Sequence, residues 1–234
     1  MAGIGEACRA LGTPVTGGNV SFYNESPEGA IFPTPTIGML GLLEEVCWAT
    51  TANFKQPGDV IFLLTPAAWL HRNDLGGSEY LAYVHGITAG DAPHLELAEE
   101  KAVQEALLTL IRAGLVQSAH DVSDGGLAVC LAECVIFSPG LGATVRIPDA
   151  AAVRRDALLF GEAQSRIVFT TSAASSAEVY RLLQGRPVQL VPIGTVEASE
   201  RLVMYVGETQ VLDLERAQLE QAYEAAIPAW FQGA

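Results

Sequence analysis

The residues from Thr16 to Glu25 place polar groups of several kinds close together, in the order Thr-Gly-Gly-Asn-Val-Ser-Phe-Tyr-Asn-Glu. The two glycines let the backbone approach a ligand closely and expose N–H donors to phosphate oxygens. The amide of Asn19 and the carboxylate of Glu25 are hard oxygen ligands of the kind that Mg²⁺ prefers. These residue types at this spacing indicate a site for a phosphorylated ligand and its metal ion.

A second polar cluster reads Ser-Ala-His-Asp-Val-Ser-Asp-Gly-Gly-Leu and lies between a predicted strand and a predicted helix. In a structural interpretation, Ser123 or Asp124 caps the helix, and the glycines allow tight packing of strand and helix. In a functional interpretation, His120 and the carboxylates of Asp121 and Asp124 converge where a helix N-terminus offers free N–H groups. The residues alone leave both interpretations open.

A third cluster, from Leu159 to Arg166, reads Leu-Phe-Gly-Glu-Ala-Gln-Ser-Arg and leads into an apolar strand. In a structural interpretation it is a solvated turn with an Arg–Glu surface pair, which contributes little to stability. A weaker fourth element, from Leu75 to Tyr80, places a Gly-Gly turn before a helix that Ser78 can cap.

Apolar periodicity predicts the elements that would position these clusters. A helix is predicted over residues 2–11, with Gly12 as its C-terminal stop. No cap precedes it, which indicates that the domain begins upstream. Strands are predicted next at residues 14–17, 37–43 and 46–49.

A polar Pro-Gly turn within residues 53–59 is the predicted domain boundary. Predicted strands and helices alternate after it, which favours an α/β or α+β domain with a mixed sheet flanked by helices. The predicted strands are 60–64, 115–119, 143–147, 166–170, 188–195 and 202–206. The predicted helices are 78–84, 95–113, 127–137, 176–183 and 214–226.

Composition limits the classes of partner. The 234 residues are 50% hydrophobic, which suffices for one large domain or two modest ones. The formal net charge of −14 argues against a nucleic-acid partner, because such a surface needs Lys and Arg to neutralise phosphates. Nucleotide binding stays open, since it uses local donors and a metal ion. No signal peptide and no apolar run of about 20 residues is present, so no membrane partner is expected.

The four cysteines form no Cys-x-x-Cys pair. Cys130 and Cys134 lie one helical turn apart in an apolar run, which favours small core residues over metal ligands. This usage fits a reducing compartment and predicts a cytoplasmic protein.

Together these motifs resemble the synthetase subunits of phosphoribosylformylglycinamidine synthase, a family of purine biosynthesis. The shared order is Gly-Asn-Val-Ser-x-Tyr-Asn-Glu, Pro-Thr-Pro-x-Ile-Gly, Leu-Gly-Gly-Ser-Glu-Tyr, Ala-His-Asp-x-Ser-Asp-Gly-Gly-Leu and Phe-Gly-Glu-x-Gln-Ser-Arg. The Asp-x-Ser-Asp-Gly-Gly element is similar across a wider superfamily, whereas Asn-Val-Ser-x-Tyr-Asn-Glu is typical of the purine enzyme.

The resemblance implies an organisation larger than this chain. Family members contain two pseudo-symmetric halves, each an A-type subdomain followed by a B-type domain. Residues 1–55 are assigned to the C-terminal remnant of the second A-type subdomain, and residues 56–234 to the second B-type domain. The first half, with the family's proposed catalytic histidines and most metal-binding carboxylates, is missing, so the fragment by itself is expected to be inactive.

The resemblance also implies an activity, cofactors and partners. The family is an ATP-dependent ligase that converts formylglycinamide ribonucleotide, ATP and glutamine-derived ammonia to formylglycinamidine ribonucleotide, ADP and phosphate, with ATP and Mg²⁺ as cofactors. The expected partners are the missing N-terminal half, a glutaminase subunit and a small accessory subunit. A homodimer of the fragment is also expected, because an exposed strand at residues 37–43 would seek pairing.

The resemblance also implies roles for the residues of this chain that match the family's motifs. Gly18 is expected to contact the nucleotide through its backbone, Asn19 to bind Mg²⁺ through its side-chain oxygen, and Ser21 to contact the substrate. No catalytic residue is assigned within this chain. An auxiliary site is assigned to His120, Asp121, Asp124, Glu162, Gln164 and Ser165.

Two other functions stay open. The first is another ATP-dependent synthetase of the superfamily, similar to aminoimidazole ribonucleotide or selenophosphate synthetase. Those enzymes usually carry a complete A-type subdomain with a Gly- and Asp-rich metal segment upstream, which this chain lacks. The second is a non-catalytic module whose B-type domain serves as a scaffold.

Overall fold

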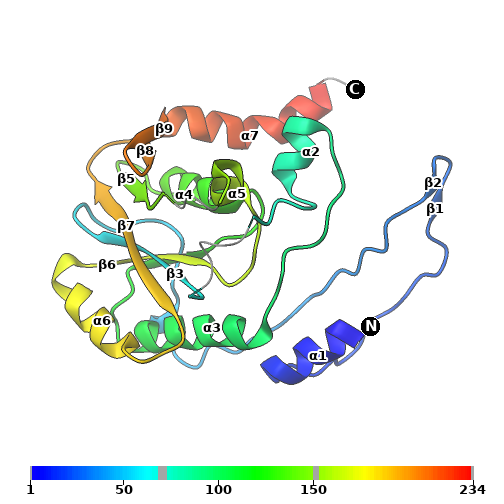
Figure 1. The fold of residues 1–234 in the computed structure, drawn as a ribbon, viewed down its shortest axis with the longest axis horizontal. Coiled ribbons are helices and arrows are strands. Elements are labelled where there is room, and N and C mark those ends of the chain that lie inside the picture. Colours follow the sequence, from blue (N-terminus) through cyan, green and yellow to red (C-terminus); the bar gives the residue numbers. More distant parts are fainter. Residues whose placement is uncertain (1, 68–72, 150–152, 233–234) are drawn as a thin grey trace. The chain divides into compact units, whose positions relative to one another are not determined.

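The computed structural model describes residues 2–67, 73–149 and 153–232. Its contacts divide the chain into two compact units, Met1–Ala49 and Thr50–Ala234 (Figure 1). The predicted assignment of residues 1–55 and 56–234 to two family subdomains stays a prediction.

The first unit has little regular structure. It begins with the predicted helix, α1 (Ala2–Leu11), which ends before Gly12 at a φ of 69°. A short hairpin of β1 (Glu25–Ser26) and β2 (Gly29–Ala30) and a 3₁₀ turn, η1 (Val46–Trp48), follow. None of its described residues is buried.

Three predicted strands of this unit are wrong. Residues 14–17 and 37–43 form no strand, and residues 46–48 form the 3₁₀ turn. A strand needs a partner for its backbone N–H and C=O groups, and apolar residues alone do not supply one. The pairing edge that was expected to support a homodimer is therefore not formed in the described chain.

The second unit is built on one seven-stranded mixed sheet, as predicted. The strand order is β4-β6-β3-β7-β5-β8-β9, and every pair is antiparallel except β5–β8. The strands are β3 (Val60–Thr65), β4 (Ser118–Asp121), β5 (Gly142–Ile147), β6 (Ile167–Thr171), β7 (Gln189–Glu197), β8 (Arg201–Val206) and β9 (Thr209–Glu215).

Helices cover both faces of this sheet (Figure 1). On one face lie α2 (Glu79–His85), α4 (Gly126–Ile136), α5 (Arg155–Phe160) and α7 (Arg216–Gln232). On the other lie α3 (Leu97–Arg112) and α6 (Ser176–Leu183), the latter preceded by the 3₁₀ turn η3 (Ala173–Ser175).

The apolar pattern explains these two layers. Along β3, Ile61 and Leu63 pack into the core under α4, whereas Phe62 and Leu64 pack into the core over α3. Successive side chains of a strand point to opposite faces, so a strand buried on both faces reads as a continuous apolar run. Helix α4 is apolar nearly all round because the sheet, α5 and α7 enclose it.

Cys130 and Cys134 of α4 are 2% and 1% exposed, which confirms that they are core residues. Within the described chain, no helix has both the length and the apolar character that crossing a membrane requires.

Candidate functional site

The polar stretch from Thr16 to Glu25 lies on exposed backbone of the first unit. A Cβ added at Gly17 or Gly18 would meet no atom within 4 Å, so these backbones are open to approach. Within the described part of the chain, the side chains of Asn19 and Ser21 make no hydrogen bond. Their polar groups are therefore available to a ligand, and the assigned roles of Gly18, Asn19 and Ser21 stay predictions.

The two later clusters meet in the second unit. They line a cavity of about 680 Å³ at the end of β4, between the segments that lead into α2, α4 and β6. This volume falls in the range of small-molecule pockets. The predicted residues that line it are Asp121, Asp124, Glu162, Gln164 and Ser165.

His120 does not belong to this cavity. Its Nε2 lies 3.1 Å from Glu133 Oε2 on α4, and its Nδ1 lies 3.7 Å from Asp121 Oδ1. Its side chain is 16% exposed, whereas that of Asp121 is 75% exposed. The two residues are neighbours on β4, and the alternation of a strand turns one towards the helix layer and leaves the other at the cavity.

The start of α4 differs from the predicted cap. Its N-cap is Gly125, with a φ of 75° and no side-chain cap, so neither Ser123 nor Asp124 fills that role. Glu162 Oε1 instead accepts a hydrogen bond of 2.9 Å from Gly125 N. The N–H group that was expected to be free for a ligand is occupied by a carboxylate from elsewhere in the chain.

The same oxygen also serves α2. Glu162 Oε1 accepts a second hydrogen bond of 2.9 Å from Glu79 N, the first residue of that helix. Ser78 caps α2, as predicted, through a hydrogen bond of 3.4 Å from Leu81 N to Ser78 Oγ. The beginnings of α2 and α4 are thus joined through one carboxylate.

The third cluster is not a solvated turn. Arg166 is 6% exposed, and its guanidinium donates from Nε to Ala163 O at 3.0 Å and from Nη2 to Gly161 O at 2.6 Å. Ser165 has a φ of 63°, and its Oγ donates to Glu100 Oε2 at 2.6 Å. A buried arginine thus binds the backbone of this loop and fixes its path into β6.

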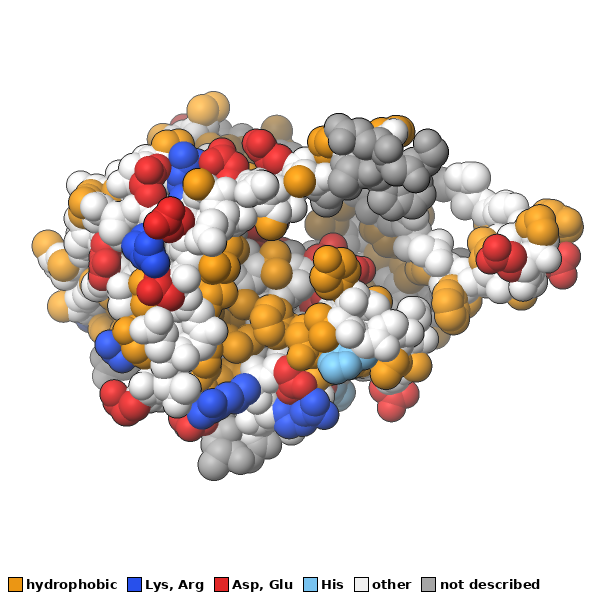
Figure 2. Space-filling model, turned by 90° about the horizontal axis from the view of Figure 1, so that it is seen from above, with side chains coloured by type: hydrophobic (Ala, Val, Ile, Leu, Met, Phe, Trp, Pro, Cys, Tyr) orange, Lys and Arg blue, Asp and Glu red, His pale blue; other side chains and the backbone are white. Residues whose placement is uncertain are grey.

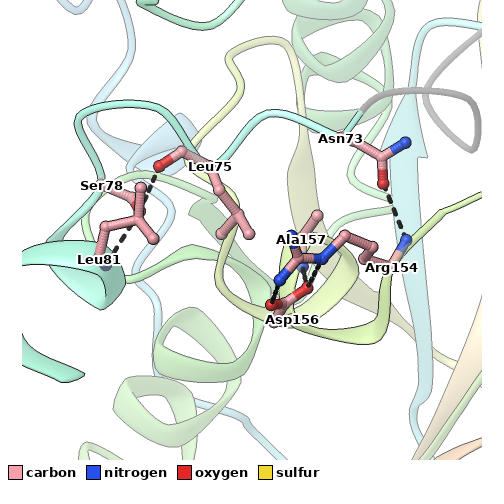
Figure 3. Close-up of polar contacts among 7 residues, drawn as sticks. All are labelled: Asn73, Leu75, Ser78, Leu81, Arg154, Asp156 and Ala157. Atoms are coloured by element: carbon pink, nitrogen blue, oxygen red, sulfur yellow. Dashed lines mark hydrogen bonds and ion pairs between the residues drawn. The ribbon is translucent and has the colours of Figure 1, made fainter. Parts of the chain in front are cut away.

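Further contacts hold the segments beside this loop, and the sequence did not reveal them. Arg154 N donates to Asn73 Oδ1 at 2.8 Å, and the Arg154 guanidinium pairs with Asp156 (Figure 3). Asp156 Oδ1 also accepts from Ala157 N at 2.9 Å in the first turn of α5. The stretch before α2 and the start of α5 are therefore tied together.

The charge of the cavity is strongly acidic. Four carboxylates and one buried guanidinium line it, from Glu100, Asp121, Asp124, Glu162 and Arg166. Glu100 was missed, because an acidic residue in the first turn of the amphipathic α3 resembles an ordinary solvated one. No group of three or more His, Cys, Asp or Glu side chains among the described residues is placed to hold a metal ion. A bare phosphate would meet repulsion here.

Comparisons place the chain among known proteins. The model of one protein family, described as AIR synthase related protein, C-terminal domain, matches residues 56–207. A phosphoribosylformylglycinamidine synthase subunit PurL of Salinibacter ruber is 55% identical over 230 residues, which cover 97% of this chain and 30% of that protein. The chain thus spans less than a third of the length of this curated relative.

Solved structures agree in fold. The chain resembles T. maritima PurL complexed with FGAR at a TM-score of 0.61 and 21% identity, over 74% of this chain and 29% of the other. It resembles T. maritima PurL complexed with ATP at a TM-score of 0.57 and 20% identity, over 74% and 27%. At such identities the likeness concerns the fold.

Proposed function

The chain belongs to the AIR synthase related protein family, and from that membership we propose that it is a C-terminal portion of the synthetase subunit of phosphoribosylformylglycinamidine synthase. The observation that carries the proposal is the 55% identity to a PurL subunit over nearly all of this chain.

The proposed reaction of the whole protein forms a carbon–nitrogen bond. ATP phosphorylates the amide oxygen of formylglycinamide ribonucleotide and leaves as ADP. Ammonia from glutamine then displaces the phosphate, which gives formylglycinamidine ribonucleotide and free phosphate. Catalysis of phosphoryl transfer rests on positioning and charge stabilisation. A bound Mg²⁺ would neutralise charge on the phosphates.

In this proposal the first unit supplies part of the reaction site. The Gly18 backbone would contact the nucleotide, and the Ser21 hydroxyl would contact the substrate. The amide oxygen of Asn19 is exposed and has no partner within the described chain, so its chemistry fits one ligand position of Mg²⁺. The remaining ligands and the catalytic groups would come from the N-terminal portion.

We also propose the partners that the resemblance implies, namely the rest of the same subunit, a glutaminase subunit that delivers ammonia and a small accessory subunit. The cavity between α2, α4 and β6 would be an auxiliary site outside the reaction centre. Its acidic lining and its internal carboxylate support that assignment.

A complementation experiment tests the proposal. This chain is mixed with the separately expressed N-terminal portion of the full-length protein, and amidine formation is measured with ammonia and Mg-ATP. We expect turnover from the mixture and none from this chain alone. Asn19→Ala should lower kcat at least tenfold, because a lost metal contact weakens charge stabilisation in the transition state.

The matched control is Glu28→Ala, which removes an exposed polar side chain of the same unit outside the shared motifs. It should leave the rate unchanged. Turnover by this chain alone, or full activity of Asn19→Ala in the mixture, would contradict the proposal.

A further inference from the structure

The carboxylate of Glu162 has an unusual position for a residue in a polar loop. One of its oxygens accepts from two backbone N–H groups, Gly125 N and Glu79 N, each at 2.9 Å. These groups lie 37 and 83 residues away in the sequence and open two different helices. A negative charge at the beginning of a helix is stabilised by the unpaired N–H groups and by the helix dipole.

The backbones around this carboxylate are packed too closely to admit side chains. A Cβ on Gly126 would lie 2.7 Å from Gly161 O, and a Cβ on Gly161 would lie 2.8 Å from Asp74 O. The loop before Glu162 thus rests directly on the start of α4 and on the segment before α2. Glu162 has little freedom to leave its two donors.

The loop is also fixed from its other side. The Arg166 guanidinium binds Gly161 O and Ala163 O, the carbonyl groups on both sides of Glu162. Glu162 lies on the wall of the acidic cavity, beside Asp124 and Gln164. Its position is therefore set by the chain around it and needs no ligand.

We propose that Glu162 is a positioning residue whose carboxylate acts as an internal anion, taking the place that a ligand anion would occupy at the start of α4. It joins the beginnings of α2 and α4 and keeps free anions out of this corner of the cavity. This role goes beyond the proposed function, since it requires neither the reaction nor its substrates.

Replacement of the carboxylate by a free anion tests the role. The thermal midpoint of Glu162→Ala is measured at constant ionic strength in sodium chloride, sodium formate and inorganic phosphate. In chloride we expect a midpoint about 5–10 °C below that of the unsubstituted chain, because two hydrogen bonds to a charged acceptor are lost. Formate should recover a measurable part of this loss, because a small carboxylate fits the vacated position.

Two controls separate this effect from general electrostatics. Glu100→Ala removes the same charge from the same cavity, but that carboxylate accepts from the Ser165 hydroxyl and joins no two helix starts. Glu162→Gln keeps an oxygen that accepts from both N–H groups. Neither should show the formate-specific rise. An equal rise in Glu100→Ala or in the unsubstituted chain, or an unchanged midpoint of Glu162→Ala in chloride, would overturn the proposal.

A second measurement needs no substituted protein. Hydrogen exchange of the unsubstituted chain should show the amides of Gly125 and Glu79 protected at least about tenfold over the exposed loop at residues 88–92, because both donate to Glu162. Exchange as fast as in that loop would overturn the proposal even if Glu162→Ala failed to fold.

Discussion

Single residues in this chain take roles that their types alone do not specify. Glu162 and Arg166 read as a surface pair in the sequence, yet each binds backbone groups, and Arg166 is buried. His120 reads as a candidate ligand, yet its ring turns to Glu133. The partners of Glu162 and His120 lie on other elements, so local spacing could not identify them. Those of Arg166 are backbone carbonyls three and five residues away, which the type of a side chain does not indicate.

Asp59 offers a pH-dependent prediction at this scale. It is 1% exposed, and its Oδ2 has no hydrogen-bond partner in the described structure. Burial raises the pKa of this carboxyl above its ordinary value of 3.8, although hydrogen bonds from Gln56 partly oppose the shift. The folded state therefore holds the proton more tightly than the unfolded state, and the charged carboxylate lowers stability at neutral pH.

Asp59→Asn should consequently raise the free energy of unfolding at pH 7 by about 1 kcal/mol. The gain should shrink as the pH falls through the raised pKa, and it should vanish below the ordinary value, where both states carry a neutral side chain. Urea unfolding between pH 3.5 and 7 measures it, with the exposed Asp91→Asn as control. A gain that is constant over this range would refute the burial argument.

Elements of the second unit followed from the sequence because their apolar patterns are long and regular. Helix α6 has the predicted bounds, and β3, β5 and β8 differ from prediction by one residue at an end. Helix α5 was missed because six residues show too little of a helical period. Strand β9 was missed because the C-terminal end of its alternating apolar and polar pattern was assigned to the helix that follows.

The candidate site was less predictable than the elements. Periodicity places β4, α4 and β6, and therefore brings the second and third clusters to one region of the sheet. It does not reveal which carboxylate caps a helix, because a cap from a distant loop leaves no local signal. The preference of helix N-caps for Ser and Asp favours Ser123 or Asp124. In the structure Glu162 accepts the hydrogen bond at this helix start instead.

The junction between α4 and α5 supports a prediction about glycine. Gly126 has a φ of 73°, and a Cβ there would lie within 2.8 Å of the backbones of Phe160 and Gly161. Gly126→Ala should lower the free energy of unfolding by about 2–4 kcal/mol, from backbone strain and overpacking together. The midpoint of urea unfolding measures this cost.

Gly114→Ala is the matched control. Gly114 has a φ of 69°, but a Cβ there would meet no atom within 4 Å, so strain alone should cost about 1 kcal/mol. Equal costs at the two glycines would contradict the overpacking argument for Gly126.

At the scale of the whole molecule, the two units differ in how they bury apolar residues. The second unit encloses two cores, one on each face of its sheet. In the first unit, by contrast, Phe22, Leu40 and Leu42 are 90%, 100% and 92% exposed. Figure 2 shows hydrophobic side chains exposed among acidic ones on the face viewed there. Large exposed apolar areas mark interaction surfaces in soluble proteins.

The proposed function supplies the partner for the first unit, since the chain spans only 30% of a close relative's length. Hydrogen–deuterium exchange should show fast exchange in residues 13–43 of the chain alone, because this segment has few backbone hydrogen bonds and no buried residues. Adding the N-terminal portion of the full-length protein should slow that exchange at least about tenfold, while β3 stays protected throughout. If activity returned and the exchange did not change, residues 13–43 would not be the contact surface. A partner that covers this exposed segment must protect the amides of the segment from exchange.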